Sequence, residues 1–353
     1  MRARALTADA RAEYRLRVAI DDFFLPDNAR LDDRLRAALA IAISGMTASV
    51  DVALRQHAAR LLASRDAPEL AERLRAEPRT VLDRLVAAGL MRDTDLMREL
   101  IGRVRSDVLS ESLPVQAPEE FDRPSLLVRL SQSDDHVIAS GAMALLGAEN
   151  RRRLTAPTDL PSWSDLPADL HHRLVWWVAA ALREQLACVA GGALPALDHA
   201  LAEAALRHIG AHDEGDRVEA VAMRLAVAID ARADELALLL VEALADRRLS
   251  LFVALIAHAL GLNFGDAREI VLDPVGDQLW PVLRALEIDR TSIARIGLAL
   301  TEADPRRDVE AFADSIDEIA DLAPINARAA VAPLLLHPDY RAAMLALARG
   351  AVA

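Results

Sequence analysis

Apolar residues recur every three to four positions along almost the whole chain, and most glycines and prolines fall between these runs. This spacing is typical of amphipathic helices, whose buried face repeats with a period of 3.6 residues. No segment alternates apolar and polar residues for long enough to predict a strand. The pattern therefore predicts an all-α protein whose helices are separated by short turns and linkers.

The N-terminal part of the chain divides into helices of unequal length. We expect helices over residues 8–24, 31–63, 67–76, 79–88 and 94–110. The second of these is by far the longest, and Gly45 is a position where it could kink. Proline-rich linkers are expected at 113–125 and 154–168.

Between the two linkers, residues 126–147 read as two helices joined by a polar turn at Asp134 and Asp135. This turn resembles that of a HEAT repeat, in which an aspartate caps the second helix. Helix pairs then recur, with starts near residues 216, 247, 274 and 304, a spacing within the range of α-solenoid units.

These observations predict an all-α fold without a sheet, a HEAT-like α-solenoid of stacked antiparallel helix pairs. We expect an N-terminal helical domain at 1–112, central HEAT-like helices at 126–190 and a C-terminal HEAT-like array at 191–353. The composition agrees, because hydrophobic residues make up 53% and aromatic residues 3%, so that Ala and Leu supply most apolar surface.

Basic and sulfur-containing residues exclude several chemistries. All 41 basic residues are Arg, and without Lys the chain has neither a Walker A loop nor a Schiff-base lysine. The single cysteine, Cys188, excludes an intrachain disulfide and a thiolate zinc site, and we expect it to be a buried, inert thiol.

The chain is acidic, with 54 acidic residues and a formal net charge of −13. A negative surface repels phosphate backbones and anionic lipids, so we expect neither nucleic acid nor membrane as a partner. The first residues lack the apolar core of a signal peptide. The uncharged stretches at 37–50 and 249–265 are shorter than the ~20 residues of a membrane helix, which favours a cytoplasmic location.

Metal and catalytic motifs are sparse. His208 and His212 are four residues apart and are the best candidates for a metal site, with Asp213 and Glu214 close behind. Gly210 is expected to fray the helix between them, and no HExxH motif occurs, so surface histidines near a helix end are the preferred interpretation. No nucleophile elbow or dinucleotide-binding glycine motif is present. We expect no catalytic residue, metal or cofactor.

Two surfaces are candidates for binding a partner. On a helix over 170–187, Trp177 shares the apolar face, whereas Trp176 lies on the other side with His172 and Arg183. Trp176 is then either covered by a neighbouring helix or exposed to a partner, and the covered arrangement is preferred.

The second surface is an acidic stripe on the helix over 306–323, opposite an apolar stripe. The acidic stripe consists of Glu310, Asp314, Asp317 and Asp321. Like charges at this spacing repel, and no Arg lies between Arg307 and Arg328 to offset them. The stripe is either a solvated face, which we prefer, or a docking surface for an Arg- or Lys-rich partner segment.

Three stretches together resemble a bacterial family of uncharacterised all-helical proteins, the domain-of-unknown-function family twenty-three thirty-six. They are residues 21–26 with 31–34, residues 166–183 with the Trp pair, and residues 249–276 with Asp273, Pro274 and Gly276. The resemblance implies a HEAT-like helical fold. It implies no activity, because none is assigned to the family.

Three hypotheses for the function follow. The first is a non-catalytic helical-repeat scaffold or adaptor that binds protein partners or forms a homodimer. The alternative is a small-molecule or lipid sensor with an apolar cavity between helices at 236–244 and 249–261, in which His258 would lie unless it is a core histidine. The third is a metal-dependent hydrolase.

Overall fold

The computed structural model describes residues 30–65, 67–76, 80–114, 124–153 and 164–350, and these residues form helices and turns without a strand. The all-α prediction is therefore confirmed for the described part of the chain. The helix predicted at 8–24 lies outside it, as does most of both predicted linkers. The helices gather around two separate buried cores, which we call the first and second lobe.

The first lobe combines helices from two distant stretches of the chain. It contains α2 (Asp33–Ser64), α3 (Pro68–Ala76), α4 (Val81–Ala87), α8 (Ala168–Ala190), α9 (Leu194–Gly210) and the N-terminal part of α5 (Thr94–Ser112). The long helix α2 runs without interruption past Gly45 and packs against both α8 and α9.

The second lobe begins at the C-terminal end of α5, where Leu109 and Leu113 join its core. It contains α6 (Leu126–Ser131), α7 (His136–Arg153), α10 (Val218–Ile229), α11 (Ala233–Ala245), α12 (Leu249–Leu260), α13 (Phe264–Leu272), α14 (Leu279–Ala285), α15 (Arg290–Ala303), α16 (Val309–Asp321) and α17 (Pro324–Val331). A short 3-10 turn, η5 (Ala332–Leu335), and the last helix, α18 (Pro338–Gly350), follow.

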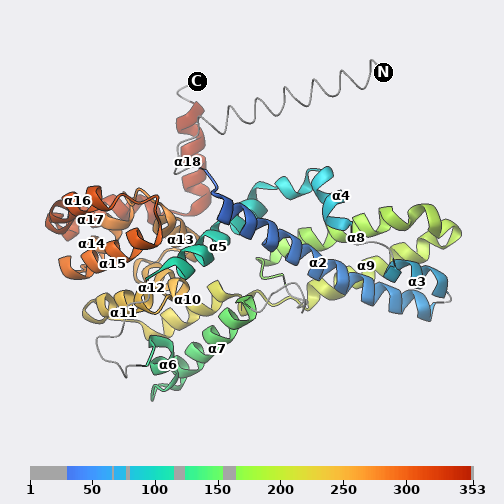
Figure 1. The fold of residues 1–353 in the computed structure, drawn as a ribbon, viewed down its shortest axis with the longest axis horizontal. Coiled ribbons are helices and arrows are strands. Elements are labelled where there is room, and N and C mark those ends of the chain that lie inside the picture. The colour runs from blue at the N-terminus through green and yellow to red at the C-terminus, as the bar shows by residue number, and fades with distance from the viewer. Residues whose placement is uncertain (1–29, 66, 77–79, 115–123, 154–163, 351–353) are drawn as a thin grey trace.

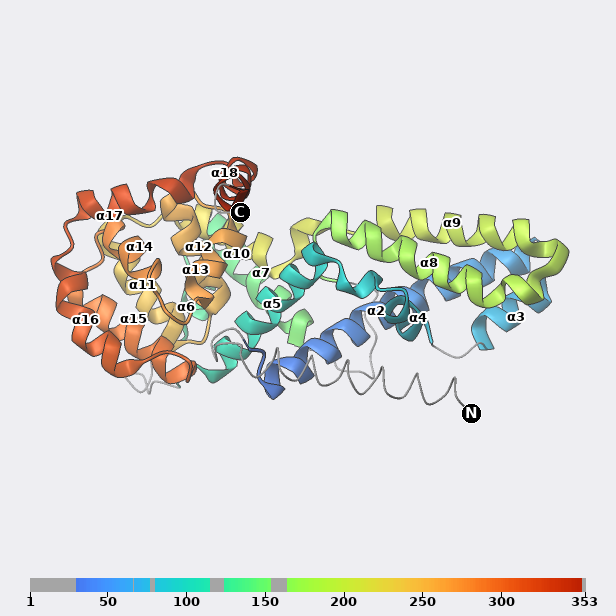
Figure 2. The same cartoon turned by 90° about the horizontal axis from the view of Figure 1, so that it is seen from above.

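The lobes lie at opposite ends of an elongated molecule (Figures 1 and 2). Helix α5 contributes to both cores, with Leu96 and Leu100 in the first and Leu109 in the second. The cores therefore do not follow the predicted division into 1–112, 126–190 and 191–353, because α8 and α9 return to pack on α2 while α6 and α7 join the second lobe.

Polar residues just before the helices explain where many of them begin. Asp32, Asp93, Asn263 and Asp289 each accept a hydrogen bond from a backbone N–H in the first turn, at 2.7–3.0 Å. Asp135 does the same for α7, since its Oδ1 accepts from Val137 N at 2.8 Å. The predicted aspartate cap of this helix is thus confirmed.

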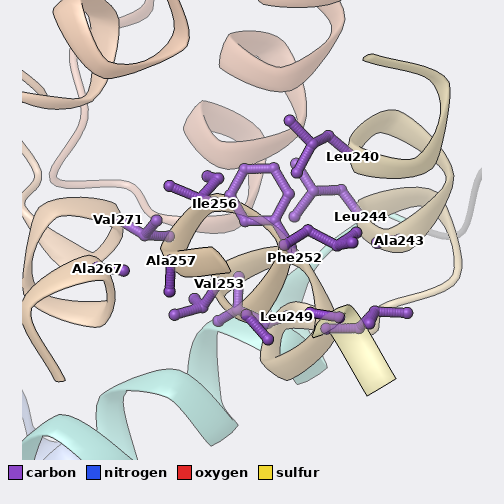
Figure 3. Packing of buried hydrophobic residues seen from close by; sticks show 14 of the residues in the cluster. Leu240, Ala243, Leu244, Leu249, Phe252, Val253, Ile256, Ala257, Ala267 and Val271 are labelled. Atoms are coloured by element: carbon purple, nitrogen blue, oxygen red, sulfur yellow. The ribbon is translucent and has the colours of Figure 1, made fainter. Parts of the chain in front are cut away.

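The second lobe is built from consecutive helix pairs. The predicted starts at 216, 247, 274 and 304 correspond to α10, α12, α14 and α16, which begin at residues 218, 249, 279 and 309. Each of these helices is followed by a second helix after a short turn, and much of the packing joins helices of different pairs, as in α10 on α12 and α14 on α17. The Phe252 ring on α12 lies beside Leu240 and Leu244 of α11, and Ile256 lies close by (Figure 3).

Two helical segments are long and apolar enough to span a membrane, judged by length and composition. They are α2 and the continuous stretch from α8 through α9, and the bent pair of α12 and α13 would make a third if counted as one span. The expected cytoplasmic location is therefore not confirmed. In the fold, α2 lies against α8 and α9, and it buries polar Thr47, Ser49, Asp51 and Arg55.

Candidate functional site

Where the lobes meet, arginines and carboxylates form a buried cluster that we call the junction network. At its centre is Arg152, the penultimate residue of α7. Its Nε donates to Asp165 Oδ2 at 2.6 Å, and its Nη2 donates to Glu219 Oε1 at 2.7 Å. Asp165 precedes α8, and Glu219 lies in the first turn of α10. One guanidinium thus links three separate segments of the chain.

The network continues toward α5 and α13. Arg217, at the N-cap of α10, donates to Glu99 of α5, and Arg268 of α13 donates to the second oxygen of Glu99 at 3.0 Å. Gly102 of α5 makes this approach possible, because a Cβ atom there would lie 2.7 Å from the Arg268 guanidinium. Arg103 adds a further contact, with Nη1 3.8 Å from Asp165 Oδ2.

Pairing decides the charge states within the network. Burial alone raises the pKa of the Glu219 carboxyl, but Arg152 and Arg217 outweigh burial and lower the pKa to about 2. Burial likewise disfavours the charged Arg152 guanidinium, but Glu219 and Asp165 hold its pKa well above the usual value. Both groups are therefore charged at neutral pH. The network is a set of compensated ion pairs, an arrangement that fixes geometry.

Two cavities lie beside the junction network and share Asp107, Glu111 and Arg152 in their walls. The cavity between α5, α7, α10 and α12 has a volume of about 390 Å³, and we call it the junction cavity. The other, between α2 and α5, measures about 300 Å³. Burial raises the pKa of the Asp107 carboxyl more than Arg152 and Arg103 lower it.

Three histidines form a second polar cluster, close to the junction network. His171 of α8 stacks on His212, with ring centroids 4.0 Å apart, and lies 5.1 Å from His208 of α9. Its Nδ1 is 2.6 Å from Ser164 Oγ. Burial, with smaller contributions from His212 and His208, lowers the pKa of His171 to about 3. The ring is therefore neutral at neutral pH.

The predicted metal candidates thus lie in the structure as members of this cluster. His208 is half-buried, and His212 Nε2 is 2.9 Å from the Leu166 carbonyl oxygen. Among the described residues, no group of three or more His, Cys, Asp or Glu is arranged so as to hold a metal ion. The two histidines are not the exposed surface pair that the sequence favoured, because α8 covers them.

The two tryptophans are alike in the structure, although the sequence analysis separated them. Both rings are half-buried and pack against the first core. Trp176 Nε1 donates to His172 Nε2 at 3.1 Å, and Arg183 pairs with Asp198 at 2.6 Å. Trp177 is not fully in the core as predicted. Trp176 is thus partly covered by the first core and partly open to solvent, and its role in partner binding stays a prediction.

Cys188 is exposed, so the prediction of a buried thiol is wrong. It continues the solvent-facing stripe of Ala180 and Glu184 along α8. The mainly apolar sequence around it does not distinguish this face from the buried ones.

The predicted acidic stripe lies on α16, which buries none of its residues completely. Glu310, Asp314 and Asp321 are exposed. Asp317 pairs with Arg290 of α15 at 2.6 Å, which relieves part of the repulsion that the sequence led us to expect. The opposite face packs through Phe312, which lies against Trp280 with ring centroids 4.8 Å apart.

His258 is partly buried, and its Nε2 is 2.8 Å from Asp230 Oδ1, so it is not enclosed in the core. It borders a pocket of about 610 Å³ at the ends of α11 and α12, whose walls also include Leu236, Leu260 and Val331. The apolar cavity expected between α11 and α12 themselves is occupied by their packed side chains (Figure 3).

None of the residues of the junction network was predicted from the sequence. Glu99, Arg152, Arg217, Glu219 and Arg268 are scattered over the chain and belong to no local motif. A weak sequence signal for buried ion pairs is the position of Arg217 and Glu219 at the start of a helix whose other residues are mostly apolar.

The fold and its junction define a two-lobed all-helical protein without a recognisable catalytic motif. Residues 120–332 match the family model described as "uncharacterised protein conserved in bacteria (DUF2336)". The chain belongs to this family, and the resemblance found in the sequence is confirmed. The matched region runs from just before α6 to the end of α17. Comparisons with curated proteins and with solved structures give no significant match.

Proposed function

We propose that this protein is a non-catalytic helical scaffold or adaptor whose C-terminal helices bind a protein partner, with a second copy of the chain as the first candidate. The observation that carries this proposal is the exposure of large apolar side chains along α17, η5 and α18. These side chains are Ile325, Leu335, Leu336, Tyr340, Met344 and Leu347, between 38% and 77% exposed. A group of exposed apolar side chains is typical of a protein-binding surface.

Helix α18 contributes half of these side chains. Tyr340, Met344 and Leu347 are spaced i, i+4 and i+7, so they share one helix face, which we call the α18 stripe. The helix stands away from the second lobe (Figure 1), and an ion pair between Arg341 and Asp266 ties it to α13. A helix with an unpaired apolar face gains stability when it packs against another apolar helix.

A second copy fits the charge pattern of α18. The only acidic residue of the helix is Asp339, near its start. Antiparallel pairing of two copies places the α18 stripes face to face and keeps the two Asp339 side chains at opposite ends of the pair. Residues 324–350 also carry three Arg and one Asp, so two such segments repel each other less than other parts of this acidic chain would.

The acidic stripe of α16 is a second surface on the same lobe, suited to an Arg- or Lys-rich partner segment. Glu310, Asp314 and Asp321 supply its uncompensated charge. We also propose that the four helix pairs of the second lobe stack in a HEAT-like manner. We further propose that the protein works in the cytoplasm without binding nucleic acid or membrane, because polar residues of α2 face protein and the chain is acidic.

A small-molecule sensor is the second candidate, and the observation that favours it is the junction cavity of about 390 Å³. Small-molecule sites have volumes of roughly 300–1,000 Å³ and often lie between structural units. A sensor of this kind could also be a scaffold, because a ligand in this cavity would stabilise the second lobe, which carries both proposed docking surfaces.

The scaffold proposal is tested by measuring the mass of the full chain by light scattering as its concentration rises. The wild type is expected to form dimers. Tyr340→Ser with Met344→Ser and Leu347→Ser is expected to stay monomeric, with an unchanged circular dichroism spectrum, because these side chains are exposed. Leu238→Ser on α11 is the matched control, since Leu238 is 62% exposed but far from α18 in the sequence.

If the wild type is monomeric, crosslinking in host cells compares the same three proteins. A partner crosslinked by the wild type and by Leu238→Ser, but lost in the triple variant, supports the proposal with a different protein as partner. The proposal is wrong if all three proteins give the same crosslinks. Recovery of lipid in place of protein would assign the α18 stripe to membranes and would also overturn it.

A further inference from the structure

The junction cavity presents more unpaired positive charge than a count of its charged wall residues suggests. Its walls include four carboxylates and three arginines, which by count alone would favour a cation. Three of the four carboxylates, however, already accept hydrogen bonds from guanidinium groups. These pairs are Glu149 with Arg248, Glu219 with Arg152, and Glu111 with Arg34.

The fourth carboxylate, Asp107, has no hydrogen-bond partner among the described residues, and its nearest cation is Arg152 at 3.7 Å. Burial raises the pKa of Asp107. Asp107 is therefore the wall carboxylate that opposes an approaching anion most directly. Arg152 itself is fully engaged by Asp165 and Glu219.

Arg153 and Arg247 are the remaining arginines in the wall, and they are not engaged. Within the described part of the chain, neither side chain has a hydrogen bond or an ion pair, and Arg247 Nε is buried without a partner. A buried N–H group without an acceptor destabilises the folded protein, and more so when the group is charged. An acceptor supplied by a ligand would remove this cost.

The backbone at Arg247 is also unusual. Its φ of +57° lies in the left-handed region, which a residue with a long side chain seldom adopts. The residue forms the turn between α11 and α12, and Ser110 of α5 donates to its carbonyl oxygen at 2.7 Å. Asp230 and Glu287 adopt the same left-handed conformation at the ends of α10 and α14, so this φ is that of a helix terminus, here with Arg247 in the cavity wall.

We propose that the junction cavity binds a small molecule through a phosphate or carboxylate group, which accepts hydrogen bonds from Arg153 and Arg247. Guanidinium groups match the planar donor pattern that phosphate and carboxylate oxygens accept. The hydroxyl groups of Ser106, Ser110 and Ser250 line the same cavity and can accept hydrogen bonds from the rest of the ligand. Val253 and Phe264 provide an apolar wall.

Such a ligand would contact α5, which enters both cores, and helices of the second lobe. Ser110 lies on α5, which enters both cores, whereas Arg153 ends α7 and Arg247 precedes α12. A molecule that binds the folded chain stabilises it in proportion to its concentration. The bound form is therefore expected to resist thermal unfolding.

The test is isothermal titration of the full chain with inorganic phosphate in one arm and succinate in the other, at matched ionic strength. Arg153→Gln with Arg247→Gln is expected to weaken binding at least tenfold. Arg73→Gln is the matched control, because it removes the same charge from an exposed position on α3 outside the cavity. Asp107→Asn is expected to tighten binding severalfold, since it removes the opposing carboxylate.

Binding of phosphate alone assigns the site to phosphate esters, and binding of succinate alone assigns it to carboxylates. Equal binding of both supports a general oxyanion site. The proposal is overturned if neither probe binds, or if the double variant binds as tightly as Arg73→Gln. Should the double variant fail to fold, Arg153→Gln alone carries the test, because its side chain is exposed and makes no contact that folding requires.

Discussion

The two lobes are built from the chain in opposite ways. In the second lobe helices α10 to α17 follow one another along the chain, and most of their packing stays within this stretch, as in α10 on α12 and α14 on α17. In the first lobe α2 packs against α8 and α9, which lie more than 100 residues further along the chain. The local sequence pattern therefore predicts most of the helices of the second lobe. The first lobe forms only when segments far apart in the sequence come together.

The most severe test of this comparison is to weaken each core separately. Phe252→Ala removes a fully buried ring from the second core and is expected to cost about 3–5 kcal/mol. Leu54→Ala in the first core is expected to cost about 2–5 kcal/mol. Because the junction network links the lobes, each variant should show one unfolding transition in urea. Two separated transitions for Leu54→Ala would mean that the lobes fold independently.

Removing the central cation of the junction network should have an effect nearly as large. Arg152→Met leaves Asp165 and Glu219 buried without their partner, which is expected to destabilise the protein by about 3–5 kcal/mol. The control is Arg84→Met, which breaks an exposed pair with Glu184 and should cost no more than about 1 kcal/mol. Equal losses of unfolding free energy in the two variants would refute a structural role for the network.

Substitutions at two glycines test how tightly the helices pack in each lobe. Gly297 lets α16 approach α15, because a Cβ atom there would lie 2.0 Å from the Phe312 ring. Gly297→Ala is therefore expected to cost about 1–3 kcal/mol through overpacking. Gly45 of α2 has open space around it, so Gly45→Ala should stabilise the first lobe by about 0.5–1 kcal/mol. Thermal unfolding of both variants checks the opposite signs.

A further expected effect is a pH dependence that comes from the first lobe. The pKa of His171 is about 3 in the folded protein and about 6.5 when unfolded. The unfolded chain therefore binds the proton first, and the contribution of His171 to stability is complete above about pH 6.5 and is lost as the pH falls toward 3. Urea unfolding at about pH 7.5 and about pH 5 should show this loss.

The variant His171→Gln should lose less stability between these two pH values than the wild type does. His199→Gln, at an exposed position on α9, should behave like the wild type. A wild-type pH response in His171→Gln would show that other groups cause the acid sensitivity.

Helix positions could be predicted from the sequence because they depend on local physics. The predicted helix at 31–63 is observed as α2 (Asp33–Ser64), and the predicted cap at Asp135 is present. Periodicity and capping act within a few residues, so they are visible in the chain itself. The same is true of the helix pairs that make up most of the second lobe.

The site could not be predicted, because its contacts join residues that are far apart. Glu99 meets Arg268 across 169 positions, and Arg55 reaches Gln185 across 130. With 41 Arg and 54 acidic residues, the sequence alone does not indicate which residues form ion pairs. The exposure of Cys188 was missed for a related reason, since it depends on which side of α8 its neighbours leave open.

The discontinuous first lobe has a consequence for synthesis of the protein. Its core cannot close until α9 has left the ribosome, about 100 residues after the end of α5. At the usual ~5–20 residues per second, the apolar sides of α2 and α5 wait roughly 5–20 seconds for their partners. During that time they are exposed to chaperones and to other nascent chains. Slow translation of the segment between α5 and α8 would lengthen this period and favour aggregation.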